Sequence, residues 1–238
     1  MPPVPTDPRT TGATPTRSYV TTFDTEESLL SENGMWLNGK ADAIDWTDVY
    51  VQGGAAIGAY ARNSVAEHRA EQGNLDGVAA EAVGDYDDPT AVLTGEWGPD
   101  QYARAEVFSR NATDDYFQEV QLRVRHVLTP GAITGYEFIF RTSKTEKAYA
   151  EIVRWDGAIG TWKSLSRAEG SQYGVQDGDI VEATIIGSKL TAYINGVEVL
   201  SAEDDTYSNG APGIGFNFGC GDTNVDHGFR SFEVHTFG

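Results

Sequence analysis

Residues whose side chains could carry out binding or acid–base chemistry lie close together in the middle of the chain. They are arginines, glutamates, a tyrosine and a tryptophan: Arg123, Arg125, Glu137, Arg141, Tyr149, Glu151 and Trp155. Arginine and carboxylate groups each reach two neighbouring hydroxyls, and an aromatic ring offers a flat surface to a sugar face. If these side chains share the outward faces of adjacent strands, they form one polar and aromatic surface suited to a glycan.

The same residues also have a purely structural interpretation. The three arginines could pair with Glu137 and Glu151 across neighbouring strands, each pair contributing about 0.2–1 kcal/mol to the sheet. Trp155 and Trp162, on either side of a predicted Asp156-Gly157 turn, are the best candidates for a ring platform. They could equally be core or rim aromatics, so both interpretations stay open.

Composition and charge narrow the class of protein. The chain has 238 residues, 27 glycines and 11% aromatic residues, which is typical of many short strands joined by turns. The net charge of −19 repels phosphates and anionic lipids, so we expect neither nucleic acid nor a membrane as a partner. A single cysteine, Cys220, cannot form an intrachain disulfide, so stability must come from a hydrophobic core.

The elements that would position these side chains are strands. In 118–127, Val120, Leu122 and Val124 alternate with polar residues, so we expect one buried face and one hydrated face. His126 has the opposite parity to Arg125 and should point away from the polar surface unless a bulge intervenes. Similar runs lie at 101–109, 135–142, 148–155, 160–166, 179–186, 189–194, 197–201, 212–218 and 229–236.

Other segments are less regular. Residues 1–20 carry five prolines and five threonines and are predicted to be an extended arm that lies against its own domain or a neighbouring subunit. Residues 21–238 are predicted to form one domain. Between 53 and 96 we expect loops and short edge strands, with a short helix only over Ser64–Gln72. Asn195-Gly196 predicts a tight hairpin.

The C-terminal half, from about residue 100, resembles the concanavalin A-like and laminin G-like jelly-roll superfamily. The resemblance lies in 135–141 followed by 148–153, in 177–183 followed by 190–197, and in 210–216 followed by 229–234. It implies a two-sheet antiparallel jelly-roll sandwich. Together with the composition, it predicts an all-β fold, a two-sheet antiparallel jelly-roll sandwich with an extended N-terminal arm. Because this fold serves lectins, carbohydrate-binding modules, polysaccharide-cleaving enzymes and phage surface proteins, it leaves the function open.

Enzymatic signatures of that superfamily are weak in this chain. Its retaining endoglucanases carry two glutamates and an aspartate on one strand, and no such Glu-x-Asp-x-Glu or Glu-x-Asp-x-x-Glu run exists here. Its lyases need a group that neutralises the uronate and a tyrosine or histidine that moves a proton. Tyr149 or Tyr193 near Arg123 and Arg141 would be the candidates for such a lyase.

Metal sites have no defined pattern. Acidic segments at 85–88, 203–205 and 221–226 could supply oxygen ligands to calcium, but none matches a known calcium loop, and the histidines are scattered. We therefore expect no cofactor, with Ca²⁺ as the one ion to consider.

The predicted function is a non-catalytic surface module that binds a polysaccharide or cell-surface glycan, neighbouring subunits, or both, outside the cell or on a virion surface. Two alternatives stay open. One is a virion structural protein of a tail, fibre or capsid decoration, docked through residues 1–20, and the other is a polysaccharide lyase.

Overall fold

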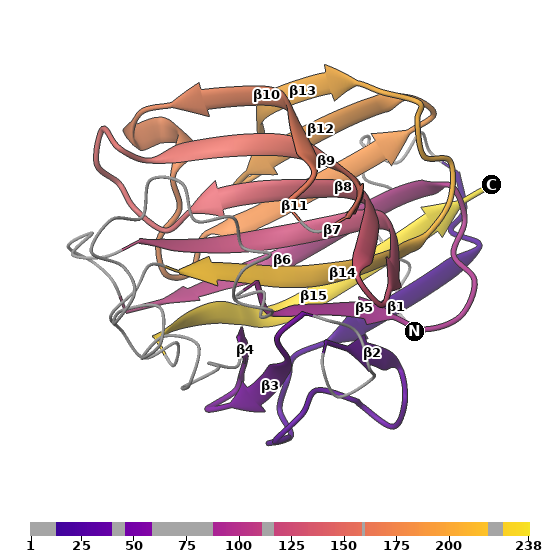
Figure 1. Cartoon of the computed structure of the whole chain (residues 1–238). Coiled ribbons are helices and arrows are strands. Elements are labelled where there is room, and N and C mark those ends of the chain that lie inside the picture. The colour runs from indigo at the N-terminus through magenta and orange to yellow at the C-terminus, as the bar shows by residue number, and fades with distance from the viewer. Residues whose placement is uncertain (1–12, 40–45, 59–87, 111–116, 159, 219–225) are drawn as a thin grey trace.

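The computed structural model describes residues 13–39, 46–58, 88–110, 117–158, 160–218 and 226–238, which form two antiparallel sheets packed face to face (Figure 1). Sheet A runs in the order β13 (Val197–Glu203), β12 (Lys189–Ile194), β11 (Ile180–Ile186), β6 (Asp100–Ser109), β15 (His227–Phe237), β4 (Ala55–Gly58) and β3 (Val49–Gln52), with β1 (Arg17–Thr21) also paired to β15. Sheet B runs in the order β10 (Trp162–Glu169), β9 (Tyr149–Ala158), β8 (Ala132–Arg141), β7 (Gln118–Thr129), β14 (Ala211–Phe218), β5 (Thr90–Leu93) and β2 (Trp36–Asn38).

The predicted all-β sandwich is confirmed. Every run predicted between 101 and 236 is a strand, with ends that differ by a few residues. A single 3₁₀ turn lies at Ser171–Tyr173, and no helix within the described ranges is long and apolar enough to cross a membrane. Between 53 and 96, β4 and β5 are short as expected, but each pairs on both sides and is not an edge strand. The helix predicted over Ser64–Gln72 lies outside the described residues.

The core lies between the two sheets. Val120, Leu122 and Val124 of β7 are completely buried, as their alternation predicts. Aromatic rings from both sheets meet there, and the ring centroids of Trp36 on β2 and Phe232 on β15 lie 5.4 Å apart. One continuous apolar cluster therefore holds the sheets together.

The N-terminal segment joins the chain's own sandwich. Arg17–Thr21 forms β1 on β15, so the boundary predicted at residue 20 falls inside a strand. The Arg17 guanidinium lies over the Trp97 ring, 3.9 Å from its centroid, and donates to the carbonyl of Glu96. Residues 1–12 lie outside the described ranges.

The outer face of β7 does not fit the sequence expectation. It was expected to be hydrated, yet Glu119, Gln121 and Arg123 are only 3%, 1% and 0% exposed. A second apolar cluster, formed by Trp46, Ile133, Val153 and Trp155, covers this face of sheet B. We call it the outer cluster. Trp46 precedes β3 and comes from a different part of the chain, so alternation within β7 could not indicate it.

A bulge in β7 redirects two side chains. Arg125 has a positive φ of 50°, and the register with both β8 and β14 shifts around it. Glycine is required opposite the bulge, because a Cβ on Gly135 or Gly210 would lie 2.5 Å or less from backbone atoms of Arg125. His126 consequently shares a face with Arg123, whereas Arg125 turns away from it.

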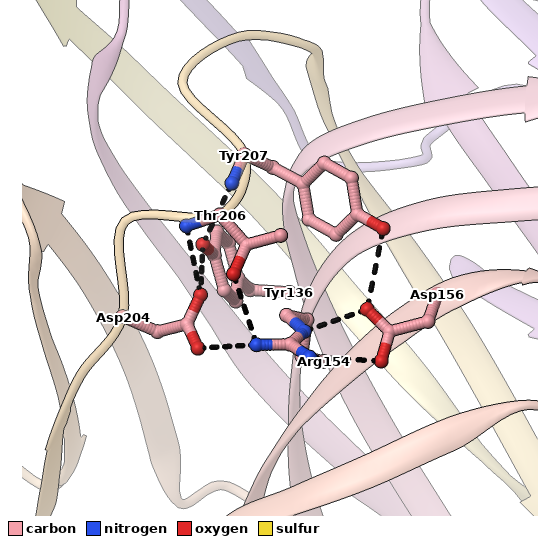
Figure 2. Close-up of polar contacts among 6 residues, drawn as sticks. All are labelled: Tyr136, Arg154, Asp156, Asp204, Thr206 and Tyr207. Atoms are coloured by element: carbon pink, nitrogen blue, oxygen red, sulfur yellow. Dashed lines mark hydrogen bonds and ion pairs between the residues drawn. The ribbon is translucent and has the colours of Figure 1, made fainter.

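A polar network fastens the β13–β14 loop to sheet B (Figure 2). Arg154 on β9 donates to both oxygens of Asp156 and, at 2.6 Å, to Asp204 in the loop. The Tyr136 hydroxyl donates to Asp204 at 2.7 Å and accepts from the Tyr207 backbone N–H. Burial disfavours the ionised form of Asp204, but the hydrogen bonds from Thr206, Tyr136 and Arg154 outweigh it and lower the pKa of Asp204 to about 2. The network is thus a structural clasp that needs an ionised Asp204.

Replacing this aspartate tests the clasp. Asp204→Asn should lower the free energy of unfolding at neutral pH by about 2 kcal/mol, because charge-assisted hydrogen bonds are lost. A folded-state pKa below the unfolded value stabilises the protein above the unfolded pKa of about 3.9, and this stability is lost as the pH falls toward 2. Urea unfolding curves of wild type and variant should therefore converge between pH 5 and pH 2, a window that follows from these two pKa values.

Asp205→Asn is the matched control, since it removes the same charge from an exposed neighbour. It should change the unfolding free energy by less than about 0.5 kcal/mol. Equal effects of the two substitutions at pH 7 would show that the clasp contributes nothing.

Candidate functional site

A pocket of about 220 Å³ opens on the outer face of sheet B. Its walls come from β7, β8, β9, β10 and β14, and from the residues that flank β5 and β7. The lining combines aromatic rings, carboxyl groups and amides: Asp88, Phe117, Glu119, Gln121, Glu137, Ile139, Tyr149, Glu151, Val153, Trp155, Trp162, Arg167 and Asn217.

The pocket is built from residues of like parity on paired strands. Register places Glu119 beside Asn217, Gln121 beside Ile139, and Ile139 beside Glu151. Because side chains opposite one another in paired strands point to the same face, residues distant in sequence gather on one surface.

Glu137 lies at the base of the pocket in a buried ion pair. Its Oε2 accepts from Arg123 Nη1 at 2.6 Å and from the Trp155 indole N–H at 2.7 Å. Burial raises the pKa of Glu137, although the Arg123 charge and the Trp155 hydrogen bond act in the opposite direction. The pair fixes the position of the Trp155 ring.

Two further glutamates face the pocket. Burial, and then the negative charges of Asp88 and Glu137, raise the pKa of Glu119 well above its usual range, and the Tyr149 hydroxyl donates to this carboxyl group. Glu151 accepts from Arg167 Nη1 at 2.6 Å. The pocket therefore holds one carboxyl group that is buried among other acidic groups and one carboxylate that is paired with a cation.

Aromatic rings line the open side. Trp162 on β10 pairs in register with Trp155 on β9, and it is 52% exposed, whereas Trp155 is buried. The Arg167 guanidinium lies 3.7 Å from the centroid of the Tyr149 ring. The accessible platform is therefore Trp162, as a rim residue, and Trp155 forms a wall beneath it.

The structure brings most of the predicted site residues together. Glu137, Tyr149, Glu151 and Trp155 line the pocket, and Arg123 lies beneath Glu137. Arg141 lies at the margin, with its guanidinium 4.4 Å from the centroid of the Phe117 ring.

Arg125 is the exception, and the expectation that it shares the outward face with the other candidates was wrong. The bulge carries its guanidinium to the end of the sandwich, where it donates to the carbonyls of Pro99, Tyr207 and Gly187 and lies 3.6 Å from Asp100. It fastens three loops and does not face the pocket.

The cross-strand pairing expected from the sequence is partly confirmed. Arg123 pairs with Glu137, but the partner of Glu151 is Arg167 and not one of the three arginines considered. Sequence reasoning missed Glu119, Gln121 and Arg167, although Glu119 and Gln121 have the same parity as Arg123. Asp88 was considered only within the acidic segment 85–88, and Phe117 and Asn217 had no local signal. The order of strands in the sheet brings all three to the pocket.

His126 is buried and faces Arg123. Its Nδ1 lies 3.2 Å from the Val124 carbonyl, which can only accept, so Nδ1 carries the proton and Nε2 accepts from Arg123 Nη1 at 3.4 Å. Burial lowers the pKa of His126 well below its usual range, with a further contribution from the Arg123 charge.

Side chains that could bind a metal ion do not cluster in the part of the chain that the structure describes. No group of three or more histidine, cysteine, aspartate or glutamate side chains there could hold an ion. Of the acidic segments considered for calcium, 203–205 contributes Asp204 to the clasp, and residues 85–87 and 221–225 lie outside the described ranges. Cys220 also lies outside them.

A second hollow of about 650 Å³ lies on the same face of sheet B. The outer cluster separates the two hollows, since Val153 and Trp155 line the pocket and two residues packed on the cluster, Leu37 and Leu128, line the second hollow. The second hollow is mainly apolar, and the carboxyl groups gather in the first.

No protein-family model and no curated protein sequence matches the chain. Solved structures do match. The carbohydrate-binding module CBM66 from Bacillus subtilis shares 11% identity, with a TM-score of 0.55, over 87% of this chain and 99% of its own. The fold is a concanavalin A-like jelly roll.

Two further structures agree on this jelly roll. The carbohydrate recognition domain of Emp46p, in its metal-free form, shares 8% identity over 91% of this chain and 98% of its own, with a TM-score of 0.53. A structure from work on endo-acting O-glycanases of the human gut microbiota shares 11% identity over 92% of this chain and 99% of its own, with a TM-score of 0.50. At these identities the likeness establishes the jelly-roll fold predicted from the sequence, and the fold alone.

The buried ion pair beneath the jelly roll's outer pocket can be tested by substitution. Glu137→Gln leaves the Arg123 guanidinium buried without its carboxylate, so we expect the free energy of unfolding to fall by about 3–5 kcal/mol. The double variant Arg123→Met, Glu137→Gln should be more stable than the single variant, because no buried charge is left. Urea unfolding of wild type, the single variants Glu137→Gln and Arg123→Met, and the double variant measures the coupling.

The exposed pair of Arg230 and Asp177, with Nη1 and Oδ1 2.7 Å apart, supplies the control. Asp177→Asn should cost no more than about 1 kcal/mol. If Glu137→Gln proves as mild as Asp177→Asn, the pair does not support the pocket.

Proposed function

We propose that the chain is a non-catalytic glycan-binding module and that the pocket on the outer face of sheet B is its binding site. One observation carries the proposal, namely an accessible tryptophan ring beside a concave surface of carboxyl and amide groups. Sugars present both an apolar face of C–H groups and a rim of hydroxyls, and this lining complements both.

Trp162 supplies the apolar contact. Its ring is about half exposed, although large apolar side chains of soluble proteins are usually buried. The neighbouring strand holds Trp155 in place through the hydrogen bond to Glu137, so one wall of the site is already ordered before a ligand arrives. A preordered wall lowers the entropic cost of binding.

The polar groups orient the sugar through hydrogen bonds to its hydroxyls. Carboxylate oxygens of Glu151 can accept from sugar hydroxyls, and the amides of Gln121 and Asn217 can both donate and accept. A volume of about 220 Å³ lies below the usual range for drug-sized ligands, and it suits a single sugar ring with the rest of a chain outside.

Two features support binding over cleavage. Glu137 is held by Arg123 and Trp155, and Glu151 by Arg167, so both carboxylates already take part in contacts that hold the site together. The proton donors considered for a lyase do not converge either: the Tyr149 hydroxyl is bound to Glu119, and Tyr193 lies on β12 of sheet A.

The names of the matched structures support the same proposal, since two of them are a carbohydrate-binding module and a carbohydrate recognition domain. We also propose that the module acts outside the cell, where polysaccharides and cell-surface glycans are met. A role in a virion, with residues 1–20 docked on another subunit, remains a prediction; residues 16–21 pair with the chain's own β15.

Removing the platform tests the proposal. On a glycan array, wild type should bind at least one glycan without releasing shortened or unsaturated products. Trp162→Ala should weaken that binding by about tenfold or more, because it removes the accessible ring platform of the site, and the loss of an aromatic anchor typically costs at least about 1.4 kcal/mol. Its melting temperature should stay close to that of wild type, since the ring is exposed.

Val197→Ala is the control, because Val197 is 65% exposed and lies on β13 in the other sheet. It should bind as wild type does. Equal binding by Trp162→Ala and wild type would refute the site, and release of products at enzymatic rates would refute a non-catalytic module.

A further inference from the structure

We infer that this pocket takes neutral saccharides and rejects saccharides that carry carboxylate or sulfate groups. The inference rests on the proposed function and deepens it, because it names the class of glycan. It follows from how the arginines around the pocket are already paired.

Recognition of an acidic sugar needs a cationic side chain whose N–H donors are not already bound to other groups. Arginine is the usual choice, because its guanidinium binds a carboxylate or sulfate through two parallel hydrogen bonds. Among the described residues that line the pocket, Arg167 is the one cationic side chain. Arg123 lies just beneath, and Arg141 at the margin.

Arg123 cannot turn to a ligand. It is completely buried, with Nη1 bound to Glu137 at 2.6 Å and Nη2 bound to Gln121 at 2.9 Å. Drawing it toward a ligand would leave Glu137 as an unpaired buried carboxylate, which is strongly unfavourable.

Arg167 is shared between two carboxylates. Its Nη1 donates to Glu151 at 2.6 Å and its Nε donates to Glu169 at 3.1 Å, while the guanidinium carbon lies 3.7 Å from the centroid of the Tyr149 ring. One positive charge therefore faces two negative charges. An acidic ligand would have to compete with both carboxylates for this guanidinium.

The rest of the pocket is also unfavourable for anions. In the described part of the chain, the lining holds four acidic side chains and one cationic side chain: Asp88, Glu119, Glu137 and Glu151, against Arg167. Arg141 lies at the margin over the Phe117 ring, within electrostatic reach of Glu119. Over longer distances, the net charge of −19 repels an approaching polyanion.

Matched ligands test the selectivity. Each neutral glycan that binds on the array is compared with the same glycan after oxidation of its primary hydroxyls to carboxylates, and Kd is measured by calorimetry. The neutral form should bind at least about tenfold more tightly, a difference of about 1.4 kcal/mol. The preference should narrow as salt is added, because the long-range repulsion is screened.

A substitution should shift the preference. Glu151→Gln frees Arg167 Nη1 inside the pocket, so the ratio of acidic to neutral affinity should rise by about tenfold. Glu169→Gln is the matched control. It also removes one negative charge beside Arg167, but Glu169 does not line the pocket, and Arg167 keeps its closer partner, Glu151. The ratio of acidic to neutral affinity in Glu169→Gln should stay close to that of wild type.

The outcomes separate the two proposals. If no glycan of either kind binds, or if binding survives Trp162→Ala unchanged, the proposed function fails. If neutral glycans bind but their oxidised forms bind equally well in wild type, only the inference of selectivity is overturned. An equal shift in Glu151→Gln and Glu169→Gln would also overturn it, because bulk charge would then account for the preference.

Discussion

The need to pair every buried charge governs the outer face of sheet B. Arg123 lies at the centre of this face with no exposed surface, so its charge is tolerable only because Glu137 lies 2.6 Å away. The same carboxylate accepts from Trp155, which in turn packs edge-on against Trp46 at a centroid distance of 5.2 Å. One ion pair thus orders the ring that walls the pocket and the cluster that bounds it.

The strands were predictable because their signal is local. A period of two in 118–127, with turn residues such as Asn195-Gly196, requires no knowledge of the rest of the chain. The burial of the outer face beneath the outer cluster was not predictable, because Trp46 comes from a distant segment. The bulge was not predictable either, since Arg125 adopts a positive φ that its residue type does not favour.

The candidate site was also predictable only where its signal is local. The alternation of side chains along β8 and β9 places Glu137 and Glu151 on the outer face, and the two strands are neighbours in the sheet. The order of strands in a jelly roll is set by long connections, so the contributions of Asp88 and Asn217 became visible only in three dimensions. Arg167 is already paired with Glu151 and Glu169. A cation that is bound to carboxylates favours recognition of neutral hydroxyls over acidic groups.

The most direct measurement of the central claim uses the indole N–H signals of the five tryptophans in a two-dimensional NMR titration with a bound neutral glycan. The account predicts that the signals of Trp155 and Trp162 shift with the ligand, while those of Trp36, in the core between the sheets, and Trp97, at the second hollow, stay in place. A saturating glycan that leaves Trp155 and Trp162 unchanged would contradict a binding site on the outer face of sheet B.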